Sequence, residues 1–333
     1  MQLSDEIITG LDQAITFEKL FFKPTFIMMI GLPGSGKSTI AKELAEIGNA
    51  KIFSSDEYRA KLLGDENDQS NNQIVFDTLY RDMLDCILVN GQNVIFDATN
   101  ITIKDRKRCL DKLSRYTINK IAYFVNTSYE ICILHDRDRS RSVGLDVINK
   151  FMAKFQFPQK FEGFDQIIMQ HHRSMEPKYD SEVAAYYLNK MKGFDQKNPH
   201  HIYSLDRHCG TLAAYANNET HNNILTEAGY FHDVGKLFTQ RIDDNGVAHY
   251  YNHDSTGAYI IASHPEITYL KTWDDIYEMI FYINFHMRAH RDFCGAKAER
   301  KYRNLFGDRL FNNLMQFAEW DRLASGTYDK EKN

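Results

Sequence analysis

A glycine-rich segment after a short apolar run constrains the fold of this chain more than any other feature. Residues 31–38 read Gly-Leu-Pro-Gly-Ser-Gly-Lys-Ser and fit the pattern G-x-x-x-x-G-K-[ST]. An apolar run at 25–30 precedes them, and a helical pattern from Lys37 to about Ile47 follows. In a turn between a strand and a helix, backbone N–H groups and the positive helix N-terminus bind nucleotide phosphates. The pattern therefore predicts a phosphate-binding loop.

This loop gives individual residues a role. Lys37 is expected at the β and γ phosphates of ATP or another nucleoside triphosphate, and the Ser38 hydroxyl is expected on Mg²⁺. The residues expected to contact the nucleotide are Gly31, Pro33, Gly34, Ser35, Gly36, Lys37, Ser38 and Thr39.

Strand-like and helix-like segments alternate as far as about residue 170. Strands are expected at 25–30, 51–53, 93–96 and 120–125, and helices near 37–47, 56–63, 72–89, 103–114, 129–137 and 145–155. This alternation predicts an α/β domain with a parallel sheet and helices on both of its faces.

The second half of the chain has a different pattern. From Ser204 onward it is helical almost throughout, with one strand-like or loop excursion at 243–251, so we expect an all-α domain. A polar stretch with Pro177 and Pro199 separates the halves. The predicted organisation is a leader helix at 1–24, an α/β domain at 25–170, a linker at 171–199 and an all-α domain at 200–333.

Polar residues follow the second and third predicted strands. Asp56 stands where a carboxylate could accept the proton of an attacking hydroxyl, or could equally cap the following helix. Arg59, one helical turn later, could bind an anionic acceptor. Asp97 and Asn100 end the third strand and are expected at the substrate, where Asp97 could order the Mg²⁺ shell or pair with Arg59.

Three arginines recur at alternate positions before the break at Gly144. Arginines in such a mobile lid can neutralise a phosphoryl group in transfer, and we expect Arg137 and Arg141 to do so. Arg139 is interpreted as an exposed helix charge.

These motifs, in this order, resemble the kinase domain of phage-type 5′-hydroxyl polynucleotide kinases over about residues 25–165. The resemblance implies that Asp56 is the general base, that Arg59 contacts the phosphate beside the acceptor nucleotide, and that Arg141 acts from the lid with Arg137. Ser55 stands where the phage enzyme has a basic residue. Small-molecule kinases share much of the same skeleton.

Histidines and aspartates recur along the second half at His208, His232, Asp233, His253, Asp254, His286, His290 and Asp321. Such side chains, carried on helices, can converge on one metal ion. The arrangement, with His-Asp-x-Gly-Lys at 232–236, resembles the HD phosphohydrolase superfamily over about 199–326.

This resemblance implies a first metal bound by His208, His232, Asp233 and Asp321. A second metal would use Asp233 as a bridge with His253 and His286, and His290 competes with His286 for that place. Lys236 would add a fixed positive charge near the phosphate. Mixed imidazole and carboxylate ligands suit Mn, Fe, Ni, Co or Zn, one or two ions, with Mg²⁺ a further candidate. His200 and His201 are expected at the hinge or cleft rim, and His171 and His172 on the surface.

Composition limits the partners and the compartment. A net charge of −5 argues against coating long nucleic acid, so any nucleic acid would be held at an end. The best basic patch comprises Lys104, Arg106, Lys107, Arg108, Arg137, Arg139 and Arg141.

The five cysteines form no C-x-x-C pair and are expected to be reduced and in the core. The longest apolar stretch is too short for a membrane span, and the acidic N-terminus predicts a cytoplasmic protein. The oligomeric state is open.

One half is thus expected to add phosphate and the other to remove it. The main hypothesis is a bifunctional end-healing enzyme that phosphorylates 5′-hydroxyl ends of RNA or DNA and removes a 3′-phosphate or 2′,3′-cyclic phosphate, before a ligase acts. One alternative is a nucleoside or metabolite kinase fused to a mononucleotide phosphohydrolase. Another is a nucleotide-responsive regulator whose second half only binds ligand.

Overall fold

The computed structural model describes residues 23–139, 142–170, 177–293 and 295–326. They form two compact units, one from Met1–Phe151 and Pro158–Met175, the other from Met152–Phe157 and Glu176–Asn333. The predicted leader helix lies almost wholly outside the described residues, and so do Arg141, His171 and His172.

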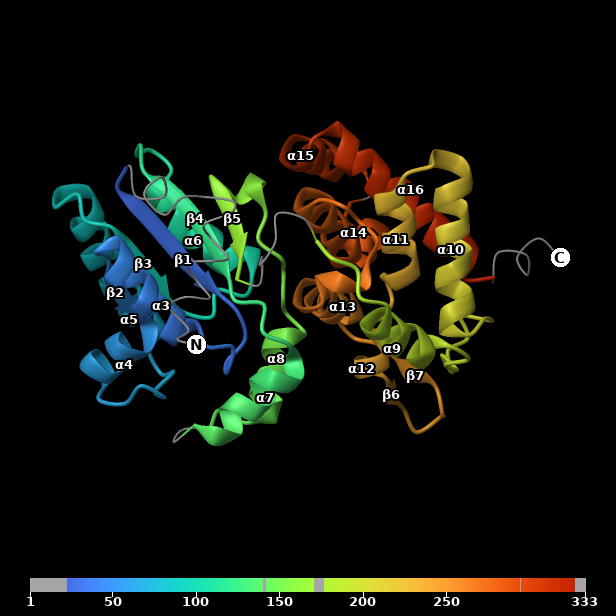
Figure 1. The fold of residues 1–333 in the computed structure, drawn as a ribbon, viewed down its shortest axis with the longest axis horizontal. Coiled ribbons are helices and arrows are strands. Elements are labelled where there is room, and N and C mark those ends of the chain that lie inside the picture. Colours follow the sequence, from blue (N-terminus) through green and yellow to red (C-terminus); the bar gives the residue numbers. More distant parts are fainter. Residues whose placement is uncertain (1–22, 140–141, 171–176, 294, 327–333) are drawn as a thin grey trace. The chain divides into compact units, whose positions relative to one another are not determined.

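The first unit is built on a five-stranded parallel sheet with the strand order β2-β3-β1-β4-β5 (Figure 1). The strands are β1 Thr25–Ile30, β2 Lys51–Ser54, β3 Val94–Asp97, β4 Asn119–Phe124 and β5 Gln166–Met169. The parallel α/β architecture expected from the sequence is confirmed. The prediction missed β5, because this short edge strand has no long apolar run.

The helices of the first unit follow the predicted segments closely. They are α3 Lys37–Gly48, α4 Ser55–Leu63, α5 Asn72–Leu84 with the π-helical turn η1 Asp85–Val89, α6 Ile103–Leu113, α7 Tyr129–Asp138, α8 Leu145–Met152 and the 3-10 turn η2 Lys160–Glu162.

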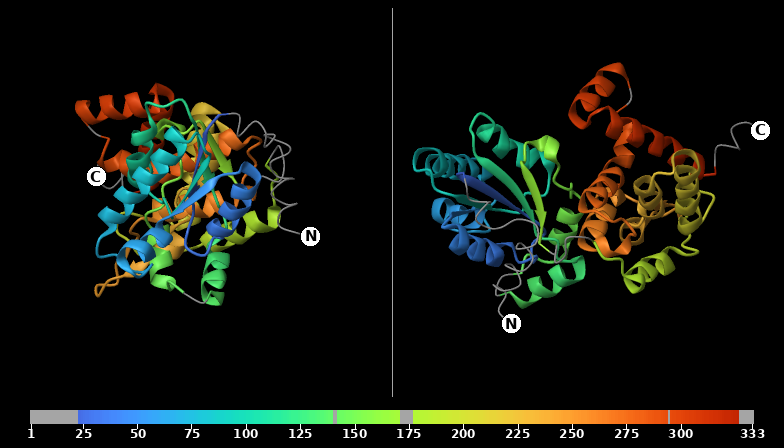
Figure 2. Two further views of the ribbon diagram at one scale, coloured as in Figure 1. Left: turned by 90° about the vertical axis from the view of Figure 1, so that its left-hand side faces the viewer. Right: turned by 45° about the horizontal axis from the view of Figure 1, so that its top comes forward.

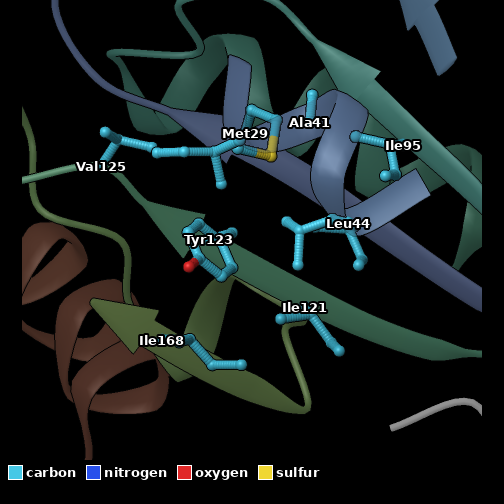
Figure 3. Packing of buried hydrophobic residues seen from close by; sticks show 10 residues of the cluster. Met29, Ala41, Leu44, Ile95, Ile121, Tyr123, Val125 and Ile168 are labelled. Atoms are coloured by element: carbon cyan, nitrogen blue, oxygen red, sulfur yellow. The ribbon is translucent and has the colours of Figure 1, made fainter. Parts of the chain in front are cut away.

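Both faces of this sheet are covered, which explains why its central strands carry runs of apolar residues, such as Phe26–Ile30 in β1 and Ile121–Phe124 in β4. Ile27 and Met29 of β1 pack with Leu44 of α3 on one face (Figure 3). On the other face, Phe96 of β3 meets the ring of Tyr80 of α5 with the centroids 5.7 Å apart. Since alternate residues of a strand point to opposite faces, the buried core has two layers around the sheet.

Over its described residues, the second unit is helical apart from one two-stranded hairpin, β6 Arg241–Ile242 with β7 Ala248–His249, in the region of the predicted excursion (Figures 1 and 2). Its helices are α9 Ser181–Met191, α10 Leu205–Thr220, α11 Asn223–Phe231, α12 Lys236–Thr239, α13 His253–Ser263, η3 Pro265–Ile267, α14 Trp273–Arg291, α15 Ala296–Phe306 and α16 Asp308–Ala324. α9 lies within the stretch predicted as a linker. α14 packs against α11, α13 and α16 and is the central helix of the unit.

Residues 152–157 belong to the second unit, although the sequence prediction placed them in the first domain. Asn284 of α14 holds them, because its Oδ1 accepts from Phe157 N at 2.9 Å and its Nδ2 donates to Phe155 O at 3.1 Å. The ring of Phe155 lies edge-on to Tyr259 at 5.0 Å. The aromatic side chains of this segment are part of the core of the second unit, which the helical pattern did not reveal.

Four cysteines, Cys86, Cys109, Cys132 and Cys209, are free and buried, as expected, and Cys294 lies outside the described residues. Among the helices described in the two units, none has the length and apolar character needed to cross a bilayer.

Candidate functional sites

The glycine-rich loop joins the central strand β1 to α3. Gly36 has φ 91° and caps α3, and Gly34 has φ 79°, a conformation that residues with a side chain rarely adopt. A Cβ added to Gly34 would overlap the carbonyl oxygen of Cys132 on α7. Glycine is therefore required there both by conformation and by the close approach of α7.

Lys37 is buried at the start of α3, and its Nζ donates to the carbonyl oxygen of Leu32 at 2.7 Å. Burial lowers the pKa of Lys37, while the nearby charges of Asp97 and, less strongly, Asp56 raise it. Ser38 is exposed in the first turn of α3, where backbone N–H groups have no partner within the helix. The loop, Lys37 and two carboxylates are thus gathered around a site suited to phosphates.

Asp56 lies in the first turn of α4, but the cap of this helix is Ser54, whose Oγ accepts from Glu57 N. The capping alternative for Asp56 is therefore wrong. Its side chain is half-exposed, and Arg59 Nη1 lies 2.5 Å from its Oδ1. Arg59 Nε also donates to Asn72 Oδ1 at 3.2 Å. The carboxylate of Asp56 is therefore held in place while its side chain stays accessible.

This pairing corrects one expectation for Arg59, the pair with Asp97, while its contact with an acceptor stays a prediction. Its carboxylate partner is Asp56, whereas a pair with Asp97 was one expectation. Only 8% of Arg59 is exposed, so it holds Asp56 and leaves little surface for an acceptor. Asp97 is buried. In the pairing of β2 with β3 it lies opposite Ser54, at the carboxyl ends of the two strands.

Asn100 and Arg106 are both buried. The amide of Asn100 donates to Met29 O at 2.8 Å and to Ala98 O at 3.3 Å, so its donors serve the sheet edge, and its contact with a substrate stays a prediction. Arg106 is fully buried against Glu162. The predicted basic patch is further reduced by the pairs Lys107–Asp111 and Arg108–Asp77.

Two of the three arginines of the predicted lid lie at the end of α7. Arg137 is exposed in the last turn of α7, and Arg139 lies beyond the helix in an extended conformation. Its side chain is 45% exposed, and its Nη1 lies 4.0 Å from Oδ1 of Asp136 in α7, which fits an exposed charge at the end of the helix. His135, which the sequence analysis did not consider, has Nδ1 2.9 Å from Gly34 O. No motif pointed to it, because α7 meets the loop only through tertiary packing.

In the second unit, four predicted metal ligands come together from α10, from the turn between α11 and α12, and from α16. His208 Nε2 lies 3.2 Å from His232 Nε2, 3.2 Å from Asp233 Oδ2 and 3.1 Å from Asp321 Oδ1. His232 Nε2 lies 3.3 Å from Asp233 Oδ2 and 3.4 Å from Asp321 Oδ1. Ligands about 2.1 Å from one zinc-like ion would be separated by about 3.0–3.4 Å, so these atoms could hold one.

A second group shares Asp233 with the first. His253 Nε2 lies 3.0 Å from Asp233 Oδ1, and His286 Nε2 lies 3.7 Å from the same atom and 3.3 Å from His253 Nε2. The two oxygens of Asp233 therefore face different groups, as a bridging ligand requires. Of the two competing histidines, His286 joins this group, while His290 Nε2 contacts Asp321 Oδ2 at 3.0 Å.

The hydrogen bonds of the imidazoles fit metal ligation. His232, His253 and His286 each have Nδ1 against a backbone carbonyl, at 3.0, 2.7 and 2.7 Å. A carbonyl only accepts, so Nδ1 carries the proton and Nε2 presents a lone pair to the centre of the cluster. Several lone pairs at about 3 Å from one another, all buried, repel unless a cation lies between them.

The pKa values of the cluster residues are consistent with a site for a cation. Burial would raise the pKa values of Asp233 and Asp321. Lys236 and the histidines hold the pKa of Asp233 well below the ordinary value, and hydrogen bonds from His208, His232 and His290 do the same for Asp321. Burial would lower the pKa of His208, but hydrogen bonds to the two aspartates raise it to about 9. Without a cation the carboxylates thus draw protons onto His208 and His232, whose pKa values are both raised, and a metal ion would displace these protons.

Lys236 places its positive charge directly beside the metal-ligand cluster. Its Nζ donates to Asp233 Oδ2 at 2.7 Å, Gln196 Oε1 at 2.8 Å and His201 Nε2 at 3.1 Å. An ammonium group has three donors, so all are engaged and none is left for a phosphate. Burial, and next the charge of Lys236, lower the pKa of His201 to about 3. His201 thus lies beside the cluster, whereas His200 is exposed.

Position 235 requires glycine, because the turn at 232–236 passes very close to the backbone of α13. A Cβ at this position would overlap the carbonyl oxygen of His253 and lie 2.6 Å from Gly257 N. Only glycine lets this turn approach α13 closely enough to bring His253 and Asp233 together.

Comparisons with known proteins concern the first unit. Residues 26–158 match the family model described as an AAA domain. Similar solved structures include a gluconokinase from Sinorhizobium meliloti 1021, with 12% identity, a TM-score of 0.33, and coverage of 44% of this chain and 81% of that chain. A sugar kinase from Janibacter sp. HTCC2649 has 13% identity, a TM-score of 0.33, and coverage of 44% of this chain and 85% of that chain. The family match, the loop and the parallel sheet define the first unit as a P-loop nucleotide-binding domain, followed by a helical region.

Proposed function

We propose that the chain is a bifunctional end-healing enzyme, with an ATP-dependent 5′-hydroxyl kinase in the first unit and an HD-type metal-dependent phosphohydrolase in the second. The observation that carries the proposal is the convergence of His208, His232, Asp233 and Asp321 in a chain that also has a phosphate-binding loop with Asp56 beside it.

In the kinase unit, the proposed reaction moves the γ-phosphoryl group of ATP to a hydroxyl. Asp56 accepts the hydroxyl proton, and Arg59 keeps its carboxylate oriented. Lys37 and the N–H groups of the loop stabilise the charge on the phosphates, and Arg137 and Arg141 are the arginines proposed to neutralise the phosphoryl group in transfer. Mg²⁺, held by Ser38 with Asp97 nearby, would neutralise phosphate charge.

In the phosphohydrolase unit, the ligands fit one or two divalent transition metals, with Mg²⁺ also a candidate. Bound there, the ions would supply a water nucleophile near neutral pH and neutralise the phosphate under attack. Asp233 would serve both positions, and Lys236 orients it. Carbonyl groups fix the ring orientation of His232, His253 and His286.

Two opposed activities on one chain make sense when they act on different ends. A broken strand with a 5′-hydroxyl and a 3′-phosphate or 2′,3′-cyclic phosphate needs phosphate added at one end and removed at the other before a ligase can join them. The substrates we propose are therefore RNA or DNA ends.

A defined RNA tests the proposal. An oligonucleotide with a 5′-hydroxyl and a 2′,3′-cyclic phosphate is incubated with γ-labelled ATP, Mg²⁺ and Mn²⁺. We expect label at the 5′ end and loss of the cyclic phosphate. Asp56→Asn should remove only the first product and Asp233→Asn only the second, with Asp77→Asn, at an exposed position, as the control. Phosphorylation of a nucleoside or sugar, without label on the RNA, would show that the acceptor is wrong.

One observation favours the alternative of a metabolite kinase joined to a mononucleotide phosphohydrolase. Arg106 is buried, and Lys107 and Arg108 are paired with acidic residues, so three of the seven residues of the predicted basic patch offer less charge to a polymer than expected. Shortening the acceptor separates the two functions, because a metabolite kinase loses no activity when the neighbouring nucleotides are removed.

A further inference from the structure

His290 lies beside the second-unit cluster without belonging to its two ligand groups. It follows His286 by one turn of α14 and shares its face. Its Nε2 lies 3.0 Å from Asp321 Oδ2. The other oxygen, Asp321 Oδ1, lies 3.1 Å from His208 Nε2 and 3.4 Å from His232 Nε2. Asp321 is thus held between an imidazole on one side and the first ligand group on the other.

The direction of this hydrogen bond follows from its partners. An ionised carboxylate only accepts hydrogen bonds, so the Nε2 of His290 is the donor. Asp321 Oδ2 is therefore engaged, and Oδ1 is the oxygen that faces the ligands. Asp233 also accepts a hydrogen bond, from Lys236 to its Oδ2, but its two oxygens face different ligand groups, Oδ2 toward His208 and Oδ1 toward His253. The neighbours of the two aspartates therefore give them different roles. Asp233 can bridge two metal positions, whereas Asp321 presents only Oδ1 to the first position because His290 engages Oδ2.

We propose that His290 is a positioning residue that restricts Asp321 to one metal-facing oxygen. This inference rests on the metal-binding function proposed for the second unit. A donor behind a metal-binding carboxylate fixes the orientation of the ligand, and the loss of such a donor weakens metal binding by about 10–100-fold. Without His290, the carboxylate of Asp321 can rotate about its terminal bond, so its ligand oxygen is no longer fixed toward the ion.

The test measures metal binding directly. The full chain, freed of metal, is titrated with Mn²⁺ alone by calorimetry, and the metal bound per chain is counted. The variants are His290→Ala, which removes the donor, and His290→Gln, whose amide nitrogen can take the place of Nε2. His264→Gln is the control. His264 belongs to neither ligand group, and its Nδ1 lies 3.1 Å from Glu266 Oε1. Since 29% of the His290 side chain is exposed, these changes leave the core packing in place.

The expected result is a Kd for Mn²⁺ about 10–100-fold weaker in His290→Ala, restored to within about threefold by His290→Gln, with an unchanged number of ions and full activity at saturating Mn²⁺. Loss of one ion per chain would make His290 a metal ligand and overturn the inference. So would an unchanged Kd with a lower kcat at saturating metal, which would place His290 at the substrate. If the unchanged protein binds no Mn²⁺, the proposed phosphohydrolase function fails, and the inference with it.

Discussion

The buried pair Arg106–Glu162 allows a sharp prediction about the stability of the first unit. Both side chains are fully buried, with Nε to Oε2 at 2.7 Å and Nη2 to Oε1 at 2.8 Å. Arg106 Nη1 also donates to the carbonyl oxygens of Asn100 and Ile101, just after β3. The pair therefore ties α6 to η2 and to the strand end that carries Asp97.

Glu162→Gln keeps the volume but leaves the guanidinium without its counter-charge. Breaking a buried pair in this way costs about 3–5 kcal/mol. If the free energy of unfolding falls by about 2 kcal/mol per M of urea, the urea concentration at the unfolding midpoint of the first unit should fall by about 1.5–2.5 M. Both tryptophans, Trp273 and Trp320, lie in the second unit, so their fluorescence follows that unit alone. The shift should be seen by circular dichroism and not by fluorescence.

The control is Asp77→Asn, which breaks the exposed pair with Arg108 and should cost less than about 1 kcal/mol. Replacing both buried partners, Arg106→Met with Glu162→Leu, should cost less than Glu162→Gln alone, because no uncompensated charge stays in the core. If Glu162→Gln shifts the midpoint no more than Asp77→Asn, the burial argument is refuted.

Three further predictions concern the sites. Asp56→Asn should lower the rate of phosphoryl transfer by about 10²–10⁴-fold while nucleotide binding is kept, as measured by kinetics and by titration with ATP. In metal-free protein, the raised pKa of His208 contributes stability that is complete below about pH 6.5 and is lost as the pH rises through about 9. Melting curves should therefore show a larger gain in Tm on adding Mn²⁺ at pH 9 than at pH 6.5, and an equal gain would contradict this. Gly235→Ala should destabilise the second unit and reduce its metal content, because its Cβ would meet the backbone of His253, whereas Gly210→Ala, with open space around it in α10, should be neutral or stabilising.

Local chemistry accounts for what could be predicted from the sequence. The phosphate-binding loop and the alternation of strands and helices depend on residues within a few positions of one another, and both gave the fold of the first unit correctly. The residue types of the cluster in the second unit could also be predicted, because histidines and aspartates that recur along helices with an adjacent His-Asp pair indicate a metal site. The short strand β5 was missed, since four edge residues carry too weak a pattern.

The arrangement of these residues in space was decided by packing between segments far apart in the chain. The pattern favoured His286 but left His290 as a competitor, and only the packing of α14 against α16 separates them. Likewise, only the structure pairs Arg59 with Asp56, buries Arg106 and uses all three donors of Lys236. The sequence by itself determined which chemical groups are present and which local turns and strands form, because short-range hydrogen bonding and periodicity set these. The tertiary structure alone decided which groups face each other, because long-range packing and the satisfaction of buried charges fix those contacts.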